Sequence, residues 1–439
     1  HYDEPETIWN LSLMLQQMED YDEAIKGFKI YGEEFIFEKG KANKFIEACQ
    51  DAKRWKERPE SFVVTNIDEV NSSASDFAPI AHADQLYFSS GRIQEEKGEV
   101  DYWTGDPYCD IYSSTMSNSE YASPTLIDAV INSNFHEGTL TISPDGNEMI
   151  FTRCGDNDDR DDYCSLYSTK RQEKGNWDEP VKLTMFDEFA NVGHPAFSMD
   201  GNGLYFSSDA SRGYGGRDIY FAKRTGRGWG VPENLGAGIN TSNDEMYPFI
   251  LDDETLFFSS NGHMGMGGLD IFSSNRINDV WENIQNVRSP LNSGADDFGY
   301  VSVNNGQSGY FSSTRQGGKG SDDIYFFKVD ETMISEDPVV YVLDIDVLQN
   351  TYTSDDPSSS VTGTTFLPDA NIEIIGMEKD IALNFISNRD GVHETIDEGE
   401  YRLVFTKEGF FTKTEIVSTQ NRFVDENNEV HIPVEVVLE

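Results

Sequence analysis

Acidic residues recur at fixed landmarks in the middle of the chain, and paired carboxylates are the groups with which many enzymes hydrolyse glycosidic bonds. One set of recurring residues opens the pattern Asp-Ile-aromatic, called the Asp-Ile-aromatic landmark below: Asp110, Asp218, Asp270 and Asp323. A second set, Glu137 and Glu245, recurs at another equivalent position. Such an enzyme needs two carboxyl groups in unlike environments, so that one is protonated while the other is ionised. Equivalent positions of a repeat share one environment, so we predict a structural role for these carboxylates.

Two histidines suggest metal binding as a second kind of chemistry. His136 and His194 lie near Glu137 and Asn191 in successive repeats. Other copies carry Glu245 or Asp297 nearby, which indicates ordinary loop or axis residues rather than ligands. We therefore predict no catalytic residue, no cofactor-binding residue and no metal ligand in this chain.

An acidic run at 156–162 lies between Cys154 and Cys164. Calcium takes six to eight oxygen ligands, but this run lacks the Gly and the terminal Glu of an EF-hand loop. A solvated hairpin tip is the favoured interpretation, and calcium binding stays open. A disulfide between the two cysteines would suit an exported protein, although spacing alone does not show that the side chains face each other. Cys49, at helical spacing among apolar residues, is expected to be buried.

Two further enzyme classes find no support in the motifs. No Gly-x-Ser-x-Gly element stands in a strand-turn-helix setting, as a serine hydrolase would require. The glycine-rich segment 213–216 lies between two strand patterns and lacks the Lys-Ser/Thr of a phosphate-binding loop.

Length and charge limit the remaining classes. The 439 residues predict two or three domains. With 79 acidic against 33 basic residues, the net charge of −46 repels nucleic acid, and it favours divalent cations or basic protein surfaces instead. No apolar run is long enough to predict a transmembrane span.

The elements that position these residues form a repeat. An aromatic strand with a central Phe occurs five times, at intervals of 63, 55, 52 and 53 residues. The central residues are Phe88, Phe151, Phe206, Phe258 and Phe311. Each copy adds a second strand marked by Asp-Ile-aromatic, or by 165–167 in the degenerate copy. A Ser-x-Asp-Gly turn precedes the aromatic strand in two copies, and a Trp-led outer strand follows it in three. Four strands per copy predict a five-bladed β-propeller over 61–332.

The ends of the repeat array predict how it closes. The fifth copy lacks an outer strand, and a spare strand pattern at 62–67 stands before the first copy. We expect this strand to complete the last blade and so to leave no exposed edge. The glycines of 213–216 and 265–268 are expected to supply positive φ angles in the hairpin connections.

Helical periodicity at residues 1–60 predicts a helical hairpin and one further helix, which end before Pro59. Beyond residue 337 the repeat disappears. Strand-like runs at 339–347, 371–375, 401–406 and 431–438 then predict a β-sandwich over 337–439, with a mobile loop at 351–363. The fold class is therefore mainly β, with N-terminal helices and a C-terminal sandwich.

Three segments resemble known families. Residues 143–151 (Ser-Pro-Asp-Gly-Asn-Glu-Met-Ile-Phe) resemble a TolB-like PD repeat, and 388–391 with 399–413 resemble a carboxypeptidase regulatory-like domain. The helical residues resemble a tetratricopeptide repeat at Ile8, Leu11, Ser12, Ala24, Phe28 and Tyr31, with Leu15 in place of the usual Tyr. In this order the segments resemble OmpA-family periplasmic proteins of Bacteroidota, some of which belong to the type IX secretion system.

The resemblance implies a non-enzymatic scaffold in the periplasm that is associated with the outer membrane. It implies protein partners from the secretion or envelope machinery, and lipid anchoring at a segment upstream of His1. Family members bind peptidoglycan through an OmpA-like domain that does not occur among these 439 residues. The alternative is a five-bladed propeller that hydrolyses or binds glycans. A hydrolase would show two carboxylates about 5–10 Å apart in a deep axial pocket.

Overall fold

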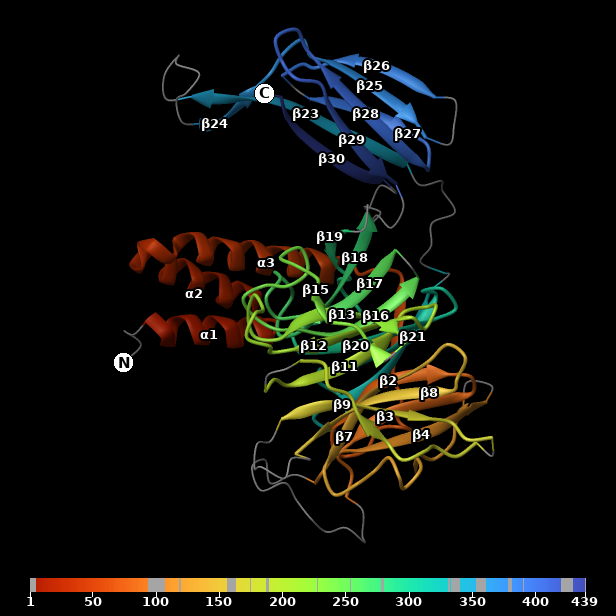
Figure 1. The fold of residues 1–439 in the computed structure, drawn as a ribbon. Coiled ribbons are helices and arrows are strands. Elements are labelled where there is room, and N and C mark those ends of the chain that lie inside the picture. Colours follow the sequence, from red (N-terminus) through yellow and green to blue (C-terminus); the bar gives the residue numbers. More distant parts are fainter. Residues whose placement is uncertain are drawn as a thin grey trace. The chain divides into compact units, whose positions relative to one another are not determined.

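A computed structural model describes residues 5–93, 107–117, 120–155, 163–173, 175–186, 189–226, 228–252, 254–277, 280–330, 332, 340–352, 361–377, 381–389, 391–419 and 429–438. The chain divides into two compact units, His1–Glu331 and Thr332–Glu439. The first unit holds the helices and the repeats, and the second holds the C-terminal strands (Figure 1). Among the described residues, no helix has the length and apolar character needed to cross a membrane.

Three helices and one short 3₁₀ turn form the N-terminal part of the first unit. They are α1 (Pro5–Gln17), α2 (Tyr21–Glu34), η1 (Ile36–Glu38) and α3 (Lys39–Glu57). The Asp20 side chain caps α2 by accepting a hydrogen bond from the backbone N–H of Glu23. Phe28 and Cys49 are fully buried between the helices, and burial raises the pKa of the Cys49 thiol to about 12. The predicted helices and the predicted burial of Cys49 are confirmed.

Five antiparallel sheets, called blades 1 to 5 below, follow the helices and are consistent with the blades of a propeller. Blade 1 contains β2 (Asp76–His82), β3 (Gln85–Ser90), β4 (Asp110–Ser117), β5 (Glu120–Tyr121) and β6 (Thr125–Leu126). Blade 2 contains β7 (His136–Ile142), β8 (Glu148–Cys154), β9 (Cys164–Lys170) and β10 (Val181–Lys182). Blade 3 contains β11 (Val192–Phe197), β12 (Gly203–Ser208), β13 (Asp218–Thr225), β14 (Gly228–Trp229) and β15 (Glu233–Asn234).

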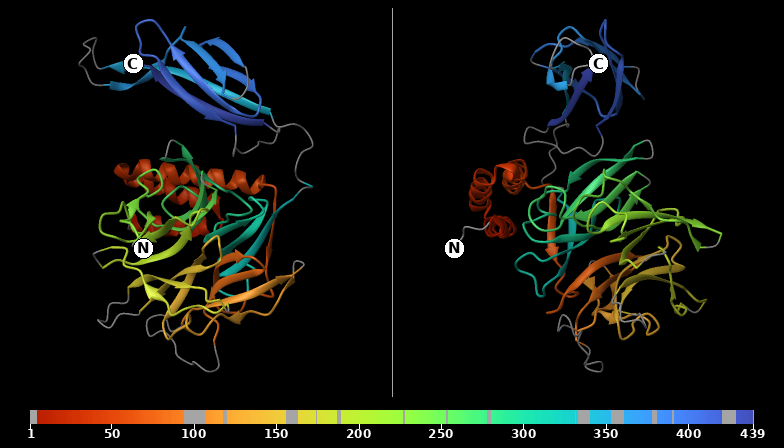
Figure 2. Two further views of the ribbon diagram at one scale, coloured as in Figure 1. Left: turned by 45° about the vertical axis from the view of Figure 1, so that its right-hand side comes forward. Right: turned by 60° about the vertical axis from the view of Figure 1, so that its left-hand side comes forward.

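Blade 4 contains β16 (Glu245–Asp252), β17 (Thr255–Ser260), β18 (Asp270–Ile277) and β19 (Val280–Asn286). Blade 5 contains β20 (Asp297–Val303), β21 (Ser308–Ser313) and β22 (Asp323–Val329), and its fourth strand is β1 (Phe62–Asn66). Strand β1 pairs antiparallel with β22, with Phe62 opposite Val329. In the right-hand view of Figure 2 the orange β1 lies beside the teal strands of blade 5. The last blade therefore takes its outer strand from the residues that precede the first blade.

The innermost strands close the blades into a ring. Contacts join β2 to β7, β7 to β11, β11 to β16, β16 to β20, and β20 back to β2. The central aromatic residue of each second strand is buried at the interface between blades, and Phe88, Phe151, Phe206, Phe258 and Phe311 are at most 1% exposed. Burying one such side chain contributes roughly 1.5–3 kcal/mol. The repeated Phe thus forms the hydrophobic core of the ring.

The glycine-rich connections differ from the prediction. The glycines at 213, 215 and 216 have no φ in the left-handed region, and neither do those at 265, 267 and 268. They are required because neighbouring atoms approach closely: a Cβ on Gly265 would lie 2.1 Å from the Asp270 Oδ2 atom. Positive φ angles occur instead in the Ser-x-Asp-Gly turns, at Gly146 (74°) and Gly201 (70°).

The second unit consists of two four-stranded sheets around one hydrophobic core. One sheet contains β23 (Val340–Tyr352), β24 (Val361–Phe366), β27 (Val392–Ile396) and β30 (Glu429–Leu438). The other contains β25 (Asn371–Gly376), β26 (Ala382–Ile386), β28 (Glu400–Thr406) and β29 (Lys413–Ser418). The loop predicted over 351–363 is wrong at both ends, because β23 continues to Tyr352 and β24 begins at Val361. Residues 353–360 lie outside the described residues.

Candidate functional site

An axial ring of five equivalent residues surrounds the centre of the first unit. They are Ala78, Thr139, His194, Tyr247 and Gly299, one from each innermost strand, with φ angles of 52°, 40°, 53°, 52° and 65°. Each lies where the pairing with the second strand of its blade shifts register. Such bulges turn the strand locally and re-aim its side chains. Four of these five residues carry a side chain, although their backbone conformation favours glycine.

Hydrogen bonds between blades hold the axial ring. The Ala78 amide donates to the Ser312 hydroxyl at 2.9 Å, and the Thr139 amide donates to the Ser89 hydroxyl at 2.9 Å. The cavity that all five ring residues line measures only about 30 Å³, which is room for about one water molecule. The axis is therefore narrow at this level.

A larger cavity, the axial recess, opens beside the axial ring between blades 1 to 4. Its volume is about 260 Å³. Its lining includes Phe77, Tyr247, Arg217, His136, His194 and both Cys154 and Cys164. This mixture of aromatic and polar groups in a concave surface is typical of ligand sites, so the recess is the candidate site.

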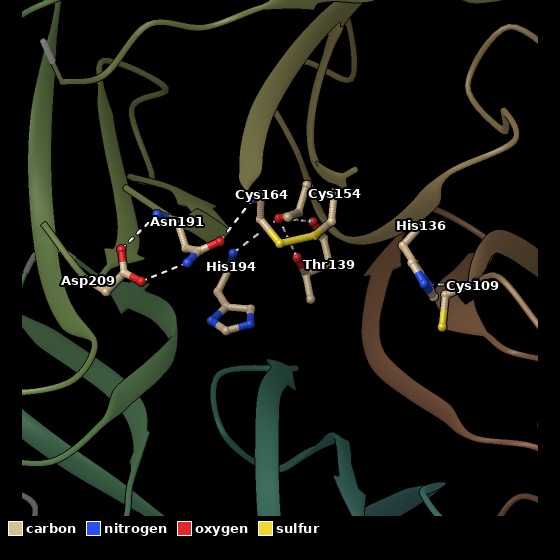
Figure 3. The surroundings of a disulfide bond; sticks show 9 residues. Cys109, His136, Thr139, Cys154, Cys164, Asn191, His194 and Asp209 are labelled. Atoms are coloured by element: carbon tan, nitrogen blue, oxygen red, sulfur yellow. Dashed lines mark hydrogen bonds between the residues drawn. A yellow bond between two sulfur atoms is a disulfide. The ribbon is translucent and has the colours of Figure 1, made fainter. Parts of the chain in front are cut away.

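A disulfide joins Cys154 to Cys164 across the β8–β9 hairpin. The sequence did not decide whether these two cysteines form a disulfide, and in the structure they do. His136 lies opposite Cys154 on β7, so these three residues form a row across three adjacent strands. In Figure 3 the disulfide lies between the Asn191–Asp209 pair on one side and the His136–Cys109 pair on the other.

His136 serves as an acceptor between blades. Its Nδ1 atom accepts a hydrogen bond from the Cys109 amide at 3.1 Å. In the next blades the Asn191 and Asp244 side chains accept the same bond, from the amides of Cys164 and Arg217, at 3.0 and 2.9 Å. His136 is therefore equivalent to Asn191 and Asp244. His194 instead belongs to the axial ring, three positions further along its strand than Asn191, so the two histidines are not equivalent in their repeats.

His194 is a neutral ring packed between polar and aromatic neighbours. Its imidazole stacks on Tyr247 with ring centroids 4.0 Å apart, and its Nδ1 atom lies 2.8 Å from the Ser207 hydroxyl oxygen. Burial, and secondly the charge of Arg217, lower the pKa of His194 to about 3. The ring is consequently uncharged at neutral pH.

The carboxylates of the Asp-Ile-aromatic landmark bind turns of their own blades. The Asp218 carboxylate accepts hydrogen bonds from the amides of Tyr214 and Gly215, at 2.6 and 3.3 Å, and Asp270 and Asp323 bind their loops in the same way. Asp110 occupies the equivalent buried position in blade 1. These four aspartates are at most 3% exposed, and none lines the recess. Burial, together with the nearby Asp297 carboxylate, raises the pKa of Asp270 to about 8.

The second set of carboxylates binds the segment that leads into each innermost strand. Glu137 accepts hydrogen bonds from the amide and hydroxyl of Ser133 and forms an ion pair with Arg153 at 2.7 Å. Glu245 binds Thr241 and the Ser260 hydroxyl in the corresponding place. Both side chains are fully buried. Glu137 is the one carboxylic acid among the described residues that line the recess, and its oxygens are occupied by these bonds.

Sequence reasoning missed a repeated asparagine that binds the third strand of blades 1, 3, 4 and 5 to the segment between that blade and its neighbour. The Asn240 side chain accepts from the Ile219 amide at 2.7 Å and donates to the Ile219 carbonyl at 3.0 Å. Asn132, Asn292 and Asn71 bind Ile111, Ile271 and Ile324 identically. In three copies the Asn follows its Ile at the same sequence distance, and this regularity could have revealed the contact.

Candidate metal ligands lie in two parts of the chain. Within the part of the chain that the structure describes, no three His, Cys, Asp or Glu side chains are placed to share a metal ion. The acidic run at 156–162 lies outside the described residues, so calcium binding there stays a prediction.

Comparison with known proteins gives a distant similarity of fold. No protein-family model matches the sequence, and no curated protein matches it. A TolB-type protein from Agrobacterium tumefaciens shares 19% identity over 46% of this chain and 61% of its own, with a TM-score of 0.29. TolB from Acinetobacter baumannii shares 12% over 84% and 80%, with a TM-score of 0.30. An α-L-arabinofuranosidase from Podospora anserina shares 9% over 61% and 93%, with a TM-score of 0.36.

This chain spans less than two thirds of the length of the first of these proteins. The matches include both TolB proteins and a glycosidase, and all three TM-scores lie below 0.5. The similarity therefore concerns the propeller-like fold and carries no conclusion about activity.

Proposed function

We propose that this chain is a non-enzymatic scaffold that binds protein partners in the periplasm, as a PorE-like component of a type IX secretion system. In this proposal the helices form a tetratricopeptide-like module, the ring is a TolB-like propeller, and the second unit is a carboxypeptidase regulatory-like domain. The scaffold acts at the outer membrane and uses no catalytic residue, cofactor or metal. The alternative is a glycan-hydrolysing or glycan-binding propeller.

An apolar stripe on the first helix carries the proposal. Leu11, Met14 and, just beyond the helix, Met18 are 42%, 58% and 69% exposed. Their spacing of three and four residues places them on one face of α1, whereas Ser12 and Gln16 are buried on another face. Exposed apolar residues that line up on one helix face favour contact with a partner, and Met side chains adapt to varied surfaces.

The helical module is fastened to the ring, so a partner bound there would be held in a fixed position relative to the blades. The Gln16 side-chain amide donates to the Gly265 carbonyl at 3.3 Å, and the Gly294 amide donates to Glu19 at 3.0 Å. Met266, from the glycine-rich loop of blade 4, is fully buried among the helix residues. A rigid junction of this kind is what positioning by a scaffold requires.

The site supports the hydrolase alternative less well. A glycosidase needs a second carboxylate facing the first across the bound sugar. The recess contains Glu137 alone among its described acids, and Glu137 is held by Ser133 and Arg153. The recurring aspartates are used in turns. The disulfide between Cys154 and Cys164 supports the proposed compartment, because such bonds persist in oxidising environments such as the periplasm.

Purification of a tagged chain from native envelopes, after mild cross-linking, tests the proposal. We expect a defined partner with the wild-type chain, and its loss when Met14→Glu and Met18→Glu are combined. Val231→Glu is the control, because Val231 is an apolar residue in blade 3 that is even more exposed, at 86%. Recovery of the chain without any companion protein, or equal recovery of the partner with the helix variant, would refute the scaffold. Release of reducing sugar from envelope glycans would favour the alternative.

A further inference from the structure

Arg217 is a cation in the axial recess that has no acidic ion-pair partner among the residues that the structure describes. Among the described residues, no carboxylate forms an ion pair with its guanidinium group, and the one side-chain contact of that group is Nη1 to the Met246 sulfur at 3.8 Å. By contrast, Arg92, Arg153 and Arg315 of the same ring pair with Asp76, Glu137 and Asp297, at 2.5, 2.7 and 2.6 Å. The chain contains 79 acidic residues, and Arg217 is half-buried. An arginine in this setting that forms no ion pair with a described carboxylate therefore differs from the other three.

The fold does not require this charge. Arg217 directly precedes the Asp-Ile-aromatic landmark of blade 3, and the residues at the same place in the other blades are Cys109, Cys164, Leu269 and Asp322. The backbone amides of Arg217 and Leu269 make the same bond, to Asp244 and Asp296. Blade 4 therefore keeps the local structure with a neutral aliphatic side chain, and the guanidinium group of blade 3 is available for another role.

The neighbours of Arg217 leave it as the charged donor of the recess. The His194 imidazole is neutral at ordinary pH, because burial lowers its pKa to about 3. The Asn191 side-chain amide is already bonded to Asp209 at 2.7 Å. Phe77 and the Tyr247 ring supply aromatic surface in the same cavity. The recess thus combines one fork-shaped cation with aromatic surface, among other polar side chains.

We propose that the axial recess binds a carboxylate group on a small, partly aromatic or aliphatic body, with the Arg217 guanidinium as its counter-ion. Guanidinium binds a carboxylate through two parallel hydrogen bonds, a geometry that a planar monoanion fits. The described lining of the recess has one cation, Arg217, and the whole chain has a net charge of −46. This charge balance disfavours ligands that carry several negative charges. The volume of about 260 Å³ limits the buried part of the ligand to roughly the space of nine water molecules.

Two sources offer this chemistry: a free organic acid, or the C-terminal carboxylate of a peptide with an apolar last residue. Both place the same group on Arg217. The proposal does not depend on the scaffold function, because the recess lies in the ring and the apolar stripe lies on α1.

Calorimetric titration of the full chain with N-acetyl-L-phenylalanine tests the proposal. We expect saturable binding, and binding at least about tenfold weaker for N-acetyl-L-phenylalaninamide, which keeps the body but loses the charge. Arg217→Leu copies Leu269 of blade 4 and should weaken binding of the acid by at least about tenfold. Arg217→Lys keeps the charge without the fork and should give an intermediate affinity. Arg212→Leu, at an exposed position of the same loop, should bind as the wild type does.

Titration with Gly-Gly-Phe distinguishes the two sources. Tighter binding of this peptide than of the acetylated amino acid identifies a peptide C-terminus, and equal binding identifies a free acid. Equal affinity for acid and amide, unchanged binding by Arg217→Leu, or no binding of either carboxylate, N-acetyl-L-phenylalanine or Gly-Gly-Phe, at millimolar concentration would overturn the proposal. A melting temperature within a few degrees of the wild type, which we expect for Arg217→Leu from the Leu269 precedent, shows that a loss of binding is not a loss of fold.

Discussion

Replacement of Asn240 by Ala should strongly destabilise the ring, although this side chain lies far from any predicted chemistry. Asn240 is 2% exposed and makes three hydrogen bonds: one from the Ile219 amide, one to the Ile219 carbonyl and one to the Asn234 side-chain oxygen. The carbonyl keeps a second donor, the Leu235 amide, whereas the Ile219 amide loses its partner. An unsatisfied buried amide costs about 1–3 kcal/mol and each other bond about 1 kcal/mol, so we expect a total loss of about 3–5 kcal/mol.

Urea unfolding followed by tryptophan fluorescence measures this loss. All six tryptophans precede residue 332, so the signal reports on the first unit alone. The control is Asn243→Ala, three residues away, because Asn243 is exposed and its side chain makes one bond, to the Asn261 carbonyl. The control should cost less than about 1 kcal/mol. A loss below about 1 kcal/mol for Asn240→Ala, or a loss equal to that of the control, would refute the role of this asparagine in binding the third strand of blade 3 to the segment between that blade and its neighbour.

Three further predictions concern the same ring. Replacing Cys154 and Cys164 by Ser opens a cross-link with a sequence separation of 10, which should lower the free energy of unfolding by about 3 kcal/mol; an unchanged urea midpoint would contradict this. Gly265→Ala places a Cβ 2.1 Å from the Asp270 carboxylate and should cost about 1–3 kcal/mol by thermal unfolding, whereas Gly226→Ala, with open space around it, should be nearly neutral. Burial raises the pKa of Asp270 from 3.8 to about 8, so the folded state holds a proton that the unfolded state releases, and stability falls as the pH rises between those values. Asp270→Asn removes this titration, so the stability of the wild type relative to the variant should be greater at about pH 5 than at about pH 8; equal differences at both pH values would show that Asp270 does not titrate in this way.

The repeat was readable because each copy encodes the same hydrogen-bonded ladder. The recurring Phe and the Asp-Ile-aromatic landmark predicted the second and third strands of every blade, and the spare pattern at 62–67 predicted a strand that the structure places beside β22. In the second unit the strands β24, β26, β27 and β29 were not predicted. Part of β24 was taken for a loop, because residues 351–363 are rich in turn formers although 361–366 pair with β23.

Side-chain roles were harder to predict than strands. The glycines of 265–268 were predicted to adopt positive φ, whereas they make room for close neighbours: the Asp270 carboxylate at Gly265, the Gly294 backbone at Gly267 and the Asp296 carboxylate at Gly268. His136 and His194 were interpreted together as loop or axis residues, but they occupy different positions of their repeats. Arg217 was not singled out. Its significance depends on which groups surround it, and those groups come from blades 1 to 4.

By itself, the sequence determined the number of repeats, their strand order and the structural role of their carboxylates, because these features depend on local patterns that recur. Tertiary structure alone decided which side chains meet at the axis, since bulges in five separate strands aim them there and hydrogen bonds between blades fix them. It also decided that Cys154 meets Cys164, and that Arg217 lines a recess whose one described acid, Glu137, pairs with Arg153 instead. Contacts between distant segments depend on register and closure, which no local pattern contains.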